Sequence, residues 1–236
     1  MRFALSAALV LAIASLMVPV SDAGESASSS WAAQGGAGGF MPLFNGKNLD
    51  GWYVRGANKE AFRVEDGVLV VTGAPGGDWL FTTSEYDNFM LRLQFRLVEN
   101  KPGAECNSGV AIRAPKEGDP AYTGMEIQVL RPDWEVPWQR AGAIYHSVPP
   151  QVQAQKKIGR WNDLEVLCDG TRIRTTLNGK VLYDIRTTDF ASKEDWRLPL
   201  IDRPAKGHIG LQDHNDRVEY RRIRIKTLPP TKGNRP

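Results

Sequence analysis

The sequence predicts an all-β protein, built as a two-sheet antiparallel sandwich of the jelly-roll type. Roughly a dozen short segments alternate apolar and polar residues with the period of two that half-buried strands have. Turn dipeptides such as Asn-Gly and Asp-Gly separate several of these segments, and almost none has a helical period. No internal repeat of about 20–50 residues is visible, which excludes a repeat protein and favours a sandwich.

The first half of the expected domain carries several strand signals. Trp52 follows an Asp-Gly turn and starts or anchors a strand. Residues 62–64 and 68–72 flank a Glu-Asp-Gly turn and form an expected hairpin. Residues 79–82 follow a glycine-rich loop, and residues 89–98 alternate apolar and polar side chains along their whole length. This last pattern is typical of a long strand with one face on the core.

Two alternating runs at the centre of the chain, residues 107–113 and 125–130, predict a pair of antiparallel strands. The side chains expected on the face away from the core are those of Asn107, Gly109, Ala111, Arg113, Glu126 and Gln128. This face offers a carboxylate, two amides and a guanidinium, and its small residues leave room above them. We therefore expect it to form the floor of a polar groove.

The segment after the central pair contains two large aromatic residues. Residues 131–142 form an expected loop that carries Trp134 and Trp138 among prolines and charged residues. Long loops in compact domains are often functional, so these side chains either stack on a sugar ring or plug the loop onto the core. Residues 143–147 predict a short strand that contains Tyr145.

A β-meander is expected next, because Asp-Gly and Asn-Gly turns join residues 161–169, 172–177 and 180–185. Residues 188–204 are irregular, with one helical turn expected near residues 191–196.

Two strands, residues 207–214 and 218–228, close the expected domain. In the first, Ile209 and Leu211 face the core. The side chains expected on the opposite face, around Gly210, are those of His208, Gln212 and His214. We expect this polar set to share a surface with the set on the central pair.

The first 23 residues have the pattern of a secretory signal peptide. Arg2 supplies a positive charge, residues 4–18 are apolar, and Ser21-Asp22-Ala23 matches a cleavage site with small residues. Residues 24–40 are an expected flexible leader rich in Gly, Ser and Ala. We therefore expect an exported protein, periplasmic or extracellular, with no membrane association after cleavage.

The remaining chain forms one β-sandwich domain over residues 41–229, followed by a disordered tail at 230–236. The net charge is +3 and the pI about 8.9, without the concentrated basic face that nucleic-acid binding requires. No Cys/His spacing typical of zinc is present. Cys106 and Cys168 could pair after export or remain two separate thiols, and the sequence leaves both options open.

Several motifs together resemble the 3-keto-disaccharide hydrolase domain family over residues 41–228. They are L-F-N-G-K-N-L-D-G-W, N-S-G-V-A-I-R, G-M-E-I-Q-V-L, G-A-I-Y, W-N-D-L-E-V with L-N-G-K, and G-H-I-G-L-Q-D-H with R-R-I-R-I. The resemblance implies a concanavalin A-like lectin/glucanase fold with ligands on a concave sheet. It also implies hydrolysis of glycosides whose sugar carries a ketone at C3. Arg131 departs from the family pattern, in which an acidic residue is common there.

A ketone at C3 makes the C2 hydrogen acidic, so a base can remove it and the group on C1 then leaves by β-elimination. Water adds to the resulting enone and completes the hydrolysis. Such chemistry requires a general base, a proton donor and hydrogen-bond donors toward the enolate oxygen. A separate oxidoreductase must make the ketone, because the chain has no dinucleotide-binding motif.

The family resemblance and the polar face together suggest roles for individual residues. Glu126 is the candidate base or acid, and His208 or His214 the second proton carrier. The residues expected to bind the carbohydrate are Asn107, Arg113, Gln128, Gln212, Tyr145, Trp134 and Trp138. No cofactor is expected, although a divalent ion held by Glu126 and the histidines could polarise the ketone.

Three alternatives remain at this point. Glu126 and Arg113 could form a simple cross-strand ion pair. The groove could belong to a non-catalytic carbohydrate-binding module of a secreted or surface assembly, or the domain could be purely structural. An ordinary glycosidase is disfavoured, because it needs two carboxylates at a set separation and the strand offers Glu126 and the amide of Gln128 instead.

Overall fold

The computed structural model describes residues 39–229, apart from residue 77 and residues 191–197. The expected signal peptide, nearly all of the leader, the helical turn near residues 191–196 and the tail from residue 230 lie outside the described residues. In the described part of the chain, no helix has the length and apolar character needed to cross a membrane.

The larger of two sheets contains eight strands within the described residues. They are β1 (Met41–Pro42), β3 (Phe62–Glu65), β4 (Val68–Val71), β6 (Phe89–Leu97), β9 (Asn162–Asp169), β10 (Arg172–Leu177), β11 (Lys180–Arg186) and β13 (Val218–Thr227). Their order across the sheet is β11, β10, β9, β6, β13, β4 and β3, and β1 also pairs with β13.

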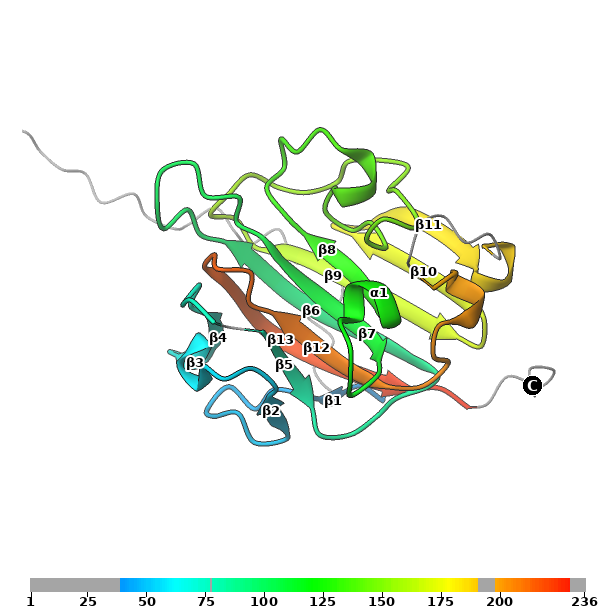
Figure 1. Ribbon diagram of the computed structural model, residues 1–236, viewed down its shortest axis with the longest axis horizontal. Helices are drawn as coiled ribbons and strands as arrows, with labels where there is room; N and C mark the ends of the chain where they lie inside the picture. Colours follow the sequence, from blue (N-terminus) through cyan, green and yellow to red (C-terminus); the bar gives the residue numbers. More distant parts are fainter. Residues whose placement is uncertain (1–38, 77, 191–197, 230–236) are drawn as a thin grey trace, which may run out of the picture. The chain divides into compact units, whose positions relative to one another are not determined.

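The smaller sheet contains five strands, again counting the described residues only. They are β2 (Trp52–Val54), β5 (Trp79–Thr82), β7 (Ser108–Ala114), β8 (Met125–Val129) and β12 (His208–Gln212). Their order is β2, β5, β12, β7 and β8, with antiparallel neighbours throughout. A short helix, α1 (Pro120–Thr123), lies in front of this sheet in Figure 1.

Short 3-10 helices complete the described structure. They are η1 (Lys59–Ala61), η2 (Pro137–Gln139), η3 (Thr187–Asp189) and η4 (Leu200–Asp202). The last two flank residues 191–197 and lie near β11 in Figure 1.

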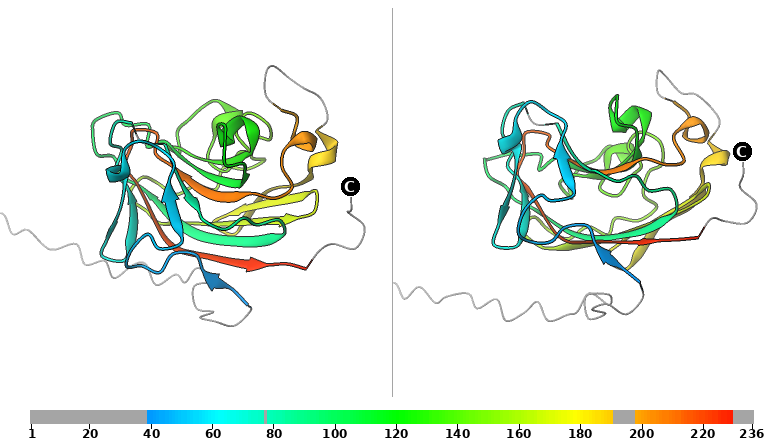
Figure 2. Two further views of the ribbon diagram at one scale, coloured as in Figure 1. Left: turned by 60° about the horizontal axis from the view of Figure 1, so that its bottom comes forward. Right: turned by 90° about the horizontal axis from the view of Figure 1, so that it is seen from below.

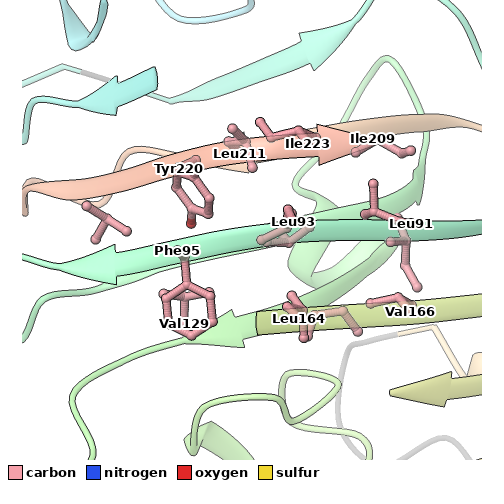
Figure 3. Packing of buried hydrophobic residues seen from close by; sticks show 14 of the residues in the cluster. Leu91, Leu93, Phe95, Val129, Leu164, Val166, Ile209, Leu211, Tyr220 and Ile223 are labelled. Atoms are coloured by element: carbon pink, nitrogen blue, oxygen red, sulfur yellow. The ribbon is translucent and has the colours of Figure 1, made fainter. Parts of the chain in front are cut away.

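The apolar core lies between the two sheets, which Figure 2 shows stacked one over the other. Leu93 and Phe95 of β6 and Leu164 of β9 meet Leu211 of β12 in this layer, and each is at most 1% exposed (Figure 3). Burying one such side chain stabilises the fold by about 1.5–3 kcal/mol. The two-sheet antiparallel sandwich expected from the sequence is therefore confirmed.

The prediction of a strand over residues 143–147 is wrong. Ile144 makes only isolated bridges to Ile127 and Val148, and the residues between form a tight turn. The N–H of Val148 donates to the carbonyl oxygen of Ile144 at 2.9 Å. His146 has a φ of 52°, in the left-handed region, which interrupts an extended strand.

Both cysteines are buried free thiols in the structure. Burial raises the pKa of Cys106 to about 11 and that of Cys168 to about 12. The structure therefore contains the second of the two alternatives left by the sequence, two separate thiols.

Candidate functional site

The candidate site lies on the outer face of the smaller sheet, the face away from the core. Tyr53, Phe81, Gly210, Ala111 and Glu126 lie in register across the strands β2, β5, β12, β7 and β8. The row passes from aromatic side chains at one edge to a carboxyl group at the other. The outward direction of Glu126 follows from the strand alternation, because Met125 and Ile127 on either side of it belong to the core.

The side chain of Glu126 lies over Gly109 on the neighbouring strand β7. A Cβ atom at Gly109 would be 1.9 Å from Oε1 of Glu126. Because Gly109 pairs with Gln128, the carboxyl group leans along the sheet toward Gln128. Glu126 is 2% exposed, and its Oε1 atom is buried without a hydrogen-bond partner.

Burial dominates the electrostatics of this carboxyl group. It raises the pKa of Glu126 to about 8, and the negative charge of Asp119 adds to the increase. The neighbouring part of the sheet face is apolar, since Phe81 and Ala111 belong to a small cluster of buried residues there. Glu126 is therefore largely protonated at neutral pH and can both donate and accept a proton near that pH.

The connection between β7 and β8 covers this face. It contains α1, which packs on both strands, and Asp119, which caps the helix by accepting a hydrogen bond from the N–H of Ala121. Arg55, just after β2, donates to the carbonyl oxygen of Gly118 in the same connection and pairs with Asp78 at 2.7 Å. These contacts hold the cover in place and explain why the carboxyl group of Glu126 is shielded from water.

Polar side chains gather on the side toward which Glu126 leans. The side-chain amide of Gln128 donates to Oδ1 of Asn107 at 3.0 Å. The backbone N–H of Asn107 donates to Asp216 at 3.1 Å, which anchors the start of β7. Gln212 ends β12 beside this group and is half-buried, as Asn107 is. The structure thus brings Glu126, Gln128, Asn107 and Gln212 to one end of the sheet face.

Tyr145 borders Glu126 on the other side. Its backbone N–H donates to the carbonyl oxygen of Glu126 at 2.9 Å. Its ring lies 6.4 Å from that of Tyr122 in α1 and 4.5 Å from that of His146. The structure therefore places Tyr145 beside the candidate site.

The two candidate histidines lie in different places. His208 is buried on the sheet face, and its Nδ1 donates to the carbonyl oxygen of Thr82 at 2.8 Å, since a carbonyl can only accept. Its Nε2 lies 3.7 Å from Oε1 of Glu85. His208 is two strands from Glu126, and the ring of Phe81 lies beside it at 5.9 Å.

His214 is exposed in the loop between β12 and β13, two residues after Gln212. In the described part of the chain, no three His, Cys, Asp or Glu side chains gather as a possible metal ligand set. Glu126, His208 and His214 therefore do not form one such set there.

The expected position of Arg113 is wrong. Its guanidinium donates to the carbonyl oxygens of Asp87 and Gly170, each at 2.8 Å, and to Oδ1 of Asn88 at 3.3 Å. Arg113 has a φ of 50°, and the pairing of β7 with β12 shifts register at this point. This bulge turns the side chain away from Glu126, which also rules out the cross-strand ion pair considered from the sequence.

The open room expected above Gly109 and Ala111 is absent, and Ala111 is fully buried. The space above Gly109 holds the carboxyl group of Glu126, and the space above Gly210 holds aromatic rings. A Cβ atom at Gly210 would be 2.6 Å from the ring of Phe81 and 3.1 Å from that of Trp79. These two rings stack with an interplanar angle of 4°. Glycine is needed at both positions because protein side chains pass over them.

The two tryptophans of the loop after β8 differ in their surroundings. Trp134 is half-buried and donates from Nε1 to Oε1 of Gln139 at 2.9 Å, as a residue that holds the loop in place would. Trp138, in η2, is 47% exposed and lines a pocket of about 680 Å³. Glu126 is not among the residues that line this pocket.

Two acidic residues near the site were not predicted from the sequence. Asp119 acts on Glu126 through its charge. Asp213 follows Gln212, has a buried Oδ2 without a hydrogen-bond partner, and burial raises its pKa to about 6. Its other oxygen accepts from the N–H of Asn215 at 2.9 Å and holds the turn. The D-H-N-D segment predicts only a turn, so nothing in the sequence indicated that this carboxyl group is buried.

Solved structures with low sequence identity share the fold. A carbohydrate-binding module from Bacillus subtilis superposes with a TM-score of 0.51 at 11% identity, over 75% of this chain and 96% of that one. A Bacillus subtilis protein with a galectin-like fold superposes with a TM-score of 0.52 at 10% identity. These likenesses agree with the jelly-roll, concanavalin A-like architecture.

Closer relatives agree with the family resemblance seen in the sequence. A 3-keto-disaccharide hydrolase of Bacteroides thetaiotaomicron is 28% identical, over 81% of this chain and 79% of its own length. A crystal structure from Parabacteroides distasonis, described as a proposed glycosyl hydrolase, is 30% identical with a TM-score of 0.69, over 80% of this chain and 99% of that one. The model of the 3-keto-alpha-glucoside-1,2-lyase-like domain family matches residues 39–226. The chain belongs to this family.

Proposed function

We propose that the protein cleaves glycosides whose sugar carries a ketone at C3, by elimination across C1 and C2 followed by addition of water. Family membership and the printed name of the Bacteroides relative support the substrate class. The observation that carries the proposal is Glu126, a buried carboxyl group on β8 whose Oε1 has no hydrogen-bond partner and whose pKa is raised to about 8.

The reaction proceeds in two steps. In the first, a base takes the C2 proton, the electron pair moves into the C3 carbonyl as an enolate, and its return expels the oxygen on C1. That oxygen takes a proton and leaves as an alcohol. In the second, water adds to C1 of the enone and C2 regains a proton. The products are the free 3-keto sugar and the alcohol, and no net oxidation or reduction occurs.

Glu126 is proposed as the proton donor to the leaving oxygen. An acid with a pKa near 8 holds its proton at neutral pH and still releases it readily to an alkoxide. The amide groups of Gln128, Asn107 and Gln212 are proposed to bind the sugar hydroxyls and the enolate oxygen, in place of Arg113. They lie on the side toward which the carboxyl group leans.

His214 is proposed as the base that takes the C2 proton. It follows Gln212 in an exposed loop at the polar end of the face. The other candidate, His208, has its Nδ1 proton bound to Thr82 and lies two strands away. We therefore assign His208 a structural role within the sheet and no role in the reaction.

The decisive experiment measures release of a chromogenic aglycone from a 3-keto glucoside and from the unoxidised parent, each with and without chelator. Release from the keto form alone supports elimination, and its loss with chelator would add a divalent ion to the mechanism. Release from the parent alone would mean ordinary glycosidase chemistry and contradict the proposal.

The matched variant is Glu126→Gln, which keeps the shape of the side chain and removes the acid. We expect loss of turnover with retained sugar binding. Glu135→Gln, which changes an exposed carboxylate in the loop after β8, serves as the control. Full turnover by Glu126→Gln would reject the assignment. Sugar binding without turnover in the parent protein would favour the carbohydrate-binding module instead.

We further propose that the protein is exported after cleavage following Ala23, which the pattern of residues 1–23 supports. A mature chain that begins at Gly24 by mass spectrometry of the secreted or periplasmic fraction would support this. An intact Met1 in a protein found only inside the cell would contradict it. The ketone itself requires a separate oxidoreductase that removes two hydrogens from the C3 alcohol of the glycoside.

A further inference from the structure

A pocket of about 680 Å³ lies outside the polar group around Glu126, and none of that group lines it. We call it the Trp138 pocket. Its walls come from η2, the turn after Ile144, β11 and the segments next to η3 and η4. Its volume falls in the range of about 300–1,000 Å³ that small-molecule sites occupy.

The walls of the Trp138 pocket are mostly apolar. The apolar side chains that line it include those of Ile185 of β11, Phe190 after η3, Leu198 and Leu200. Trp138 lines it with a large aromatic side chain that is 47% exposed. An exposed tryptophan beside aliphatic and aromatic side chains favours a flat ring system, which can stack on the indole ring.

Several polar side chains also line the pocket, but four of them are already hydrogen-bonded within the protein. His146 contacts Gln139 at 2.8 Å, Tyr183 donates to the carbonyl oxygen of Gly142 at 2.9 Å, and Arg203 donates to Ser147 at 3.1 Å. Gln151 and Asp189 also line the pocket and are exposed, so they can meet hydroxyl groups at the rim of a ligand. A sugar carries hydroxyl groups around its whole ring, and burying them against apolar walls without partners is costly. The Trp138 pocket therefore suits an apolar ring with one or two hydroxyl groups better than it suits a sugar.

A buried arginine fixes this pocket relative to Glu126. Arg203 is 6% exposed and donates to the carbonyl oxygen of Gly124 at 2.9 Å and to the hydroxyl of Ser147 at 3.1 Å. Gly124 lies two residues before Glu126, and Ser147 lies two residues after Tyr145, whose N–H binds Glu126. Arg203 and Ser147 both line the pocket, so its wall and the candidate acid belong to one hydrogen-bonded frame.

We propose that the Trp138 pocket binds the aglycone of the substrate, an aromatic ring system with phenolic character, in preference to a second sugar. This inference rests on the proposed function, because an aglycone exists only for a glycoside-cleaving protein. The group that leaves from C1 would then rest in the Trp138 pocket while its oxygen takes the proton of Glu126.

The first test measures binding of a free bicyclic phenol, 2-naphthol, to the full chain by isothermal titration calorimetry. We expect Trp138→Ala to weaken binding about tenfold, as the loss of a central aromatic contact does. Gln151→Trp fills the pocket from an exposed position and should weaken binding as much. Val136→Ala, an exposed neighbour outside the pocket, should leave it unchanged. Equal binding by all four proteins, or none by the parent, overturns the proposal.

The second test compares kcat/KM for the 3-keto glucoside of 2-naphthol with that for a 3-keto disaccharide. We expect the aryl glycoside to be preferred at least tenfold, and Trp138→Ala and Gln151→Trp to reduce this preference. Turnover without any preference overturns the aglycone site and leaves the proposed function intact. Binding of 2-naphthol that depends on Trp138, with turnover of neither glycoside, overturns the proposed function and the aglycone role together.

Discussion

The Oε1 atom of Glu126 lies 1.9 Å from the position that a Cβ atom on Gly109 would occupy, so the two residues share one space on the sheet face. The orientation of the carboxyl group thus depends on glycine at position 109, which has no side chain to occupy this space. Gly109 is not among the residues with positive φ, so its backbone would accept alanine, and the three atoms nearest to the added Cβ all belong to Glu126.

Gly109→Ala should displace the carboxyl group of Glu126. We expect kcat/KM on the 3-keto substrate to fall about 100-fold or more, as small misplacements of catalytic groups do. The free energy of unfolding should fall by about 1–3 kcal/mol from overpacking. Urea unfolding combined with steady-state kinetics measures both effects.

A double-mutant cycle isolates the contact. In a Glu126→Ala background, the added methyl group meets no carboxyl group, so Gly109→Ala should cost little stability. An equal cost in both backgrounds would mean that the methyl group clashes with something other than Glu126.

The pH dependence of the reaction should reveal the protonation of Glu126. Burial raises the pKa of this group to about 8, so a proton donor at this position loses its proton above that pH. We expect kcat/KM to fall with increasing pH through about pH 8, with a midpoint that is absent in the residual activity of Glu126→Gln. A rise through the same range would make Glu126 the base instead of the acid.

The free energy of unfolding should also depend on pH through Glu126. It should fall with increasing pH, whereas a salt-bridged carboxylate makes it rise. The folded pKa of about 8 exceeds the ordinary value of 4.5, so the folded state binds more protons between these values and stability falls as pH rises through them. The loss is up to about 5 kcal/mol and is complete above pH 8.

Urea unfolding of the parent protein and Glu126→Gln at pH 5 and pH 9 measures this effect. The amide variant cannot ionise, so it should gain stability relative to the parent between the two pH values. A difference between the two proteins that stays constant with pH would show that Glu126 is not buried as a titrating group.

Arg113 should matter for stability and not for chemistry. Arg113→Met removes hydrogen bonds to Asp87, Gly170 and Asn88 in the buried interior, and we expect a loss of about 3 kcal/mol. Turnover per folded molecule should match the parent at a temperature where both are folded. Arg160→Met, an exposed position, is the control and should change stability by less than about 0.5 kcal/mol. A selective loss of kcat/KM in Arg113→Met would restore its substrate-binding role.

The strands could be predicted from the sequence because their signals are local. Residues 79–82 form β5 as expected, and residues 89–97 form β6, one residue shorter than expected. Alternation and turn dipeptides identify such segments without knowledge of their neighbours. The segment at residues 143–147 failed because the left-handed conformation of His146 leaves no mark in the alternation.

The site was predicted only in part, since its geometry depends on contacts between strands. The outward direction of Glu126 and Gln128 follows from alternation alone. The rotation of Arg113 follows from a bulge that alternation cannot show. Likewise, the rings above Gly210 come from β5, whose pairing with β12 is set by the whole sheet. Helix α1, with four residues, is too short to show a period.

The order of the strands has a consequence for how the protein folds during its synthesis. β13 lies between β4 and β6 in the larger sheet, and β12 lies between β5 and β7 in the smaller one. Both of these central strands come from the end of the domain, so neither sheet can be completed until nearly the whole domain has left the ribosome. Until then, the edges of β4, β5, β6 and β7 stay open to other strands. An incomplete chain is therefore the form of this protein most exposed to aggregation through strand pairing.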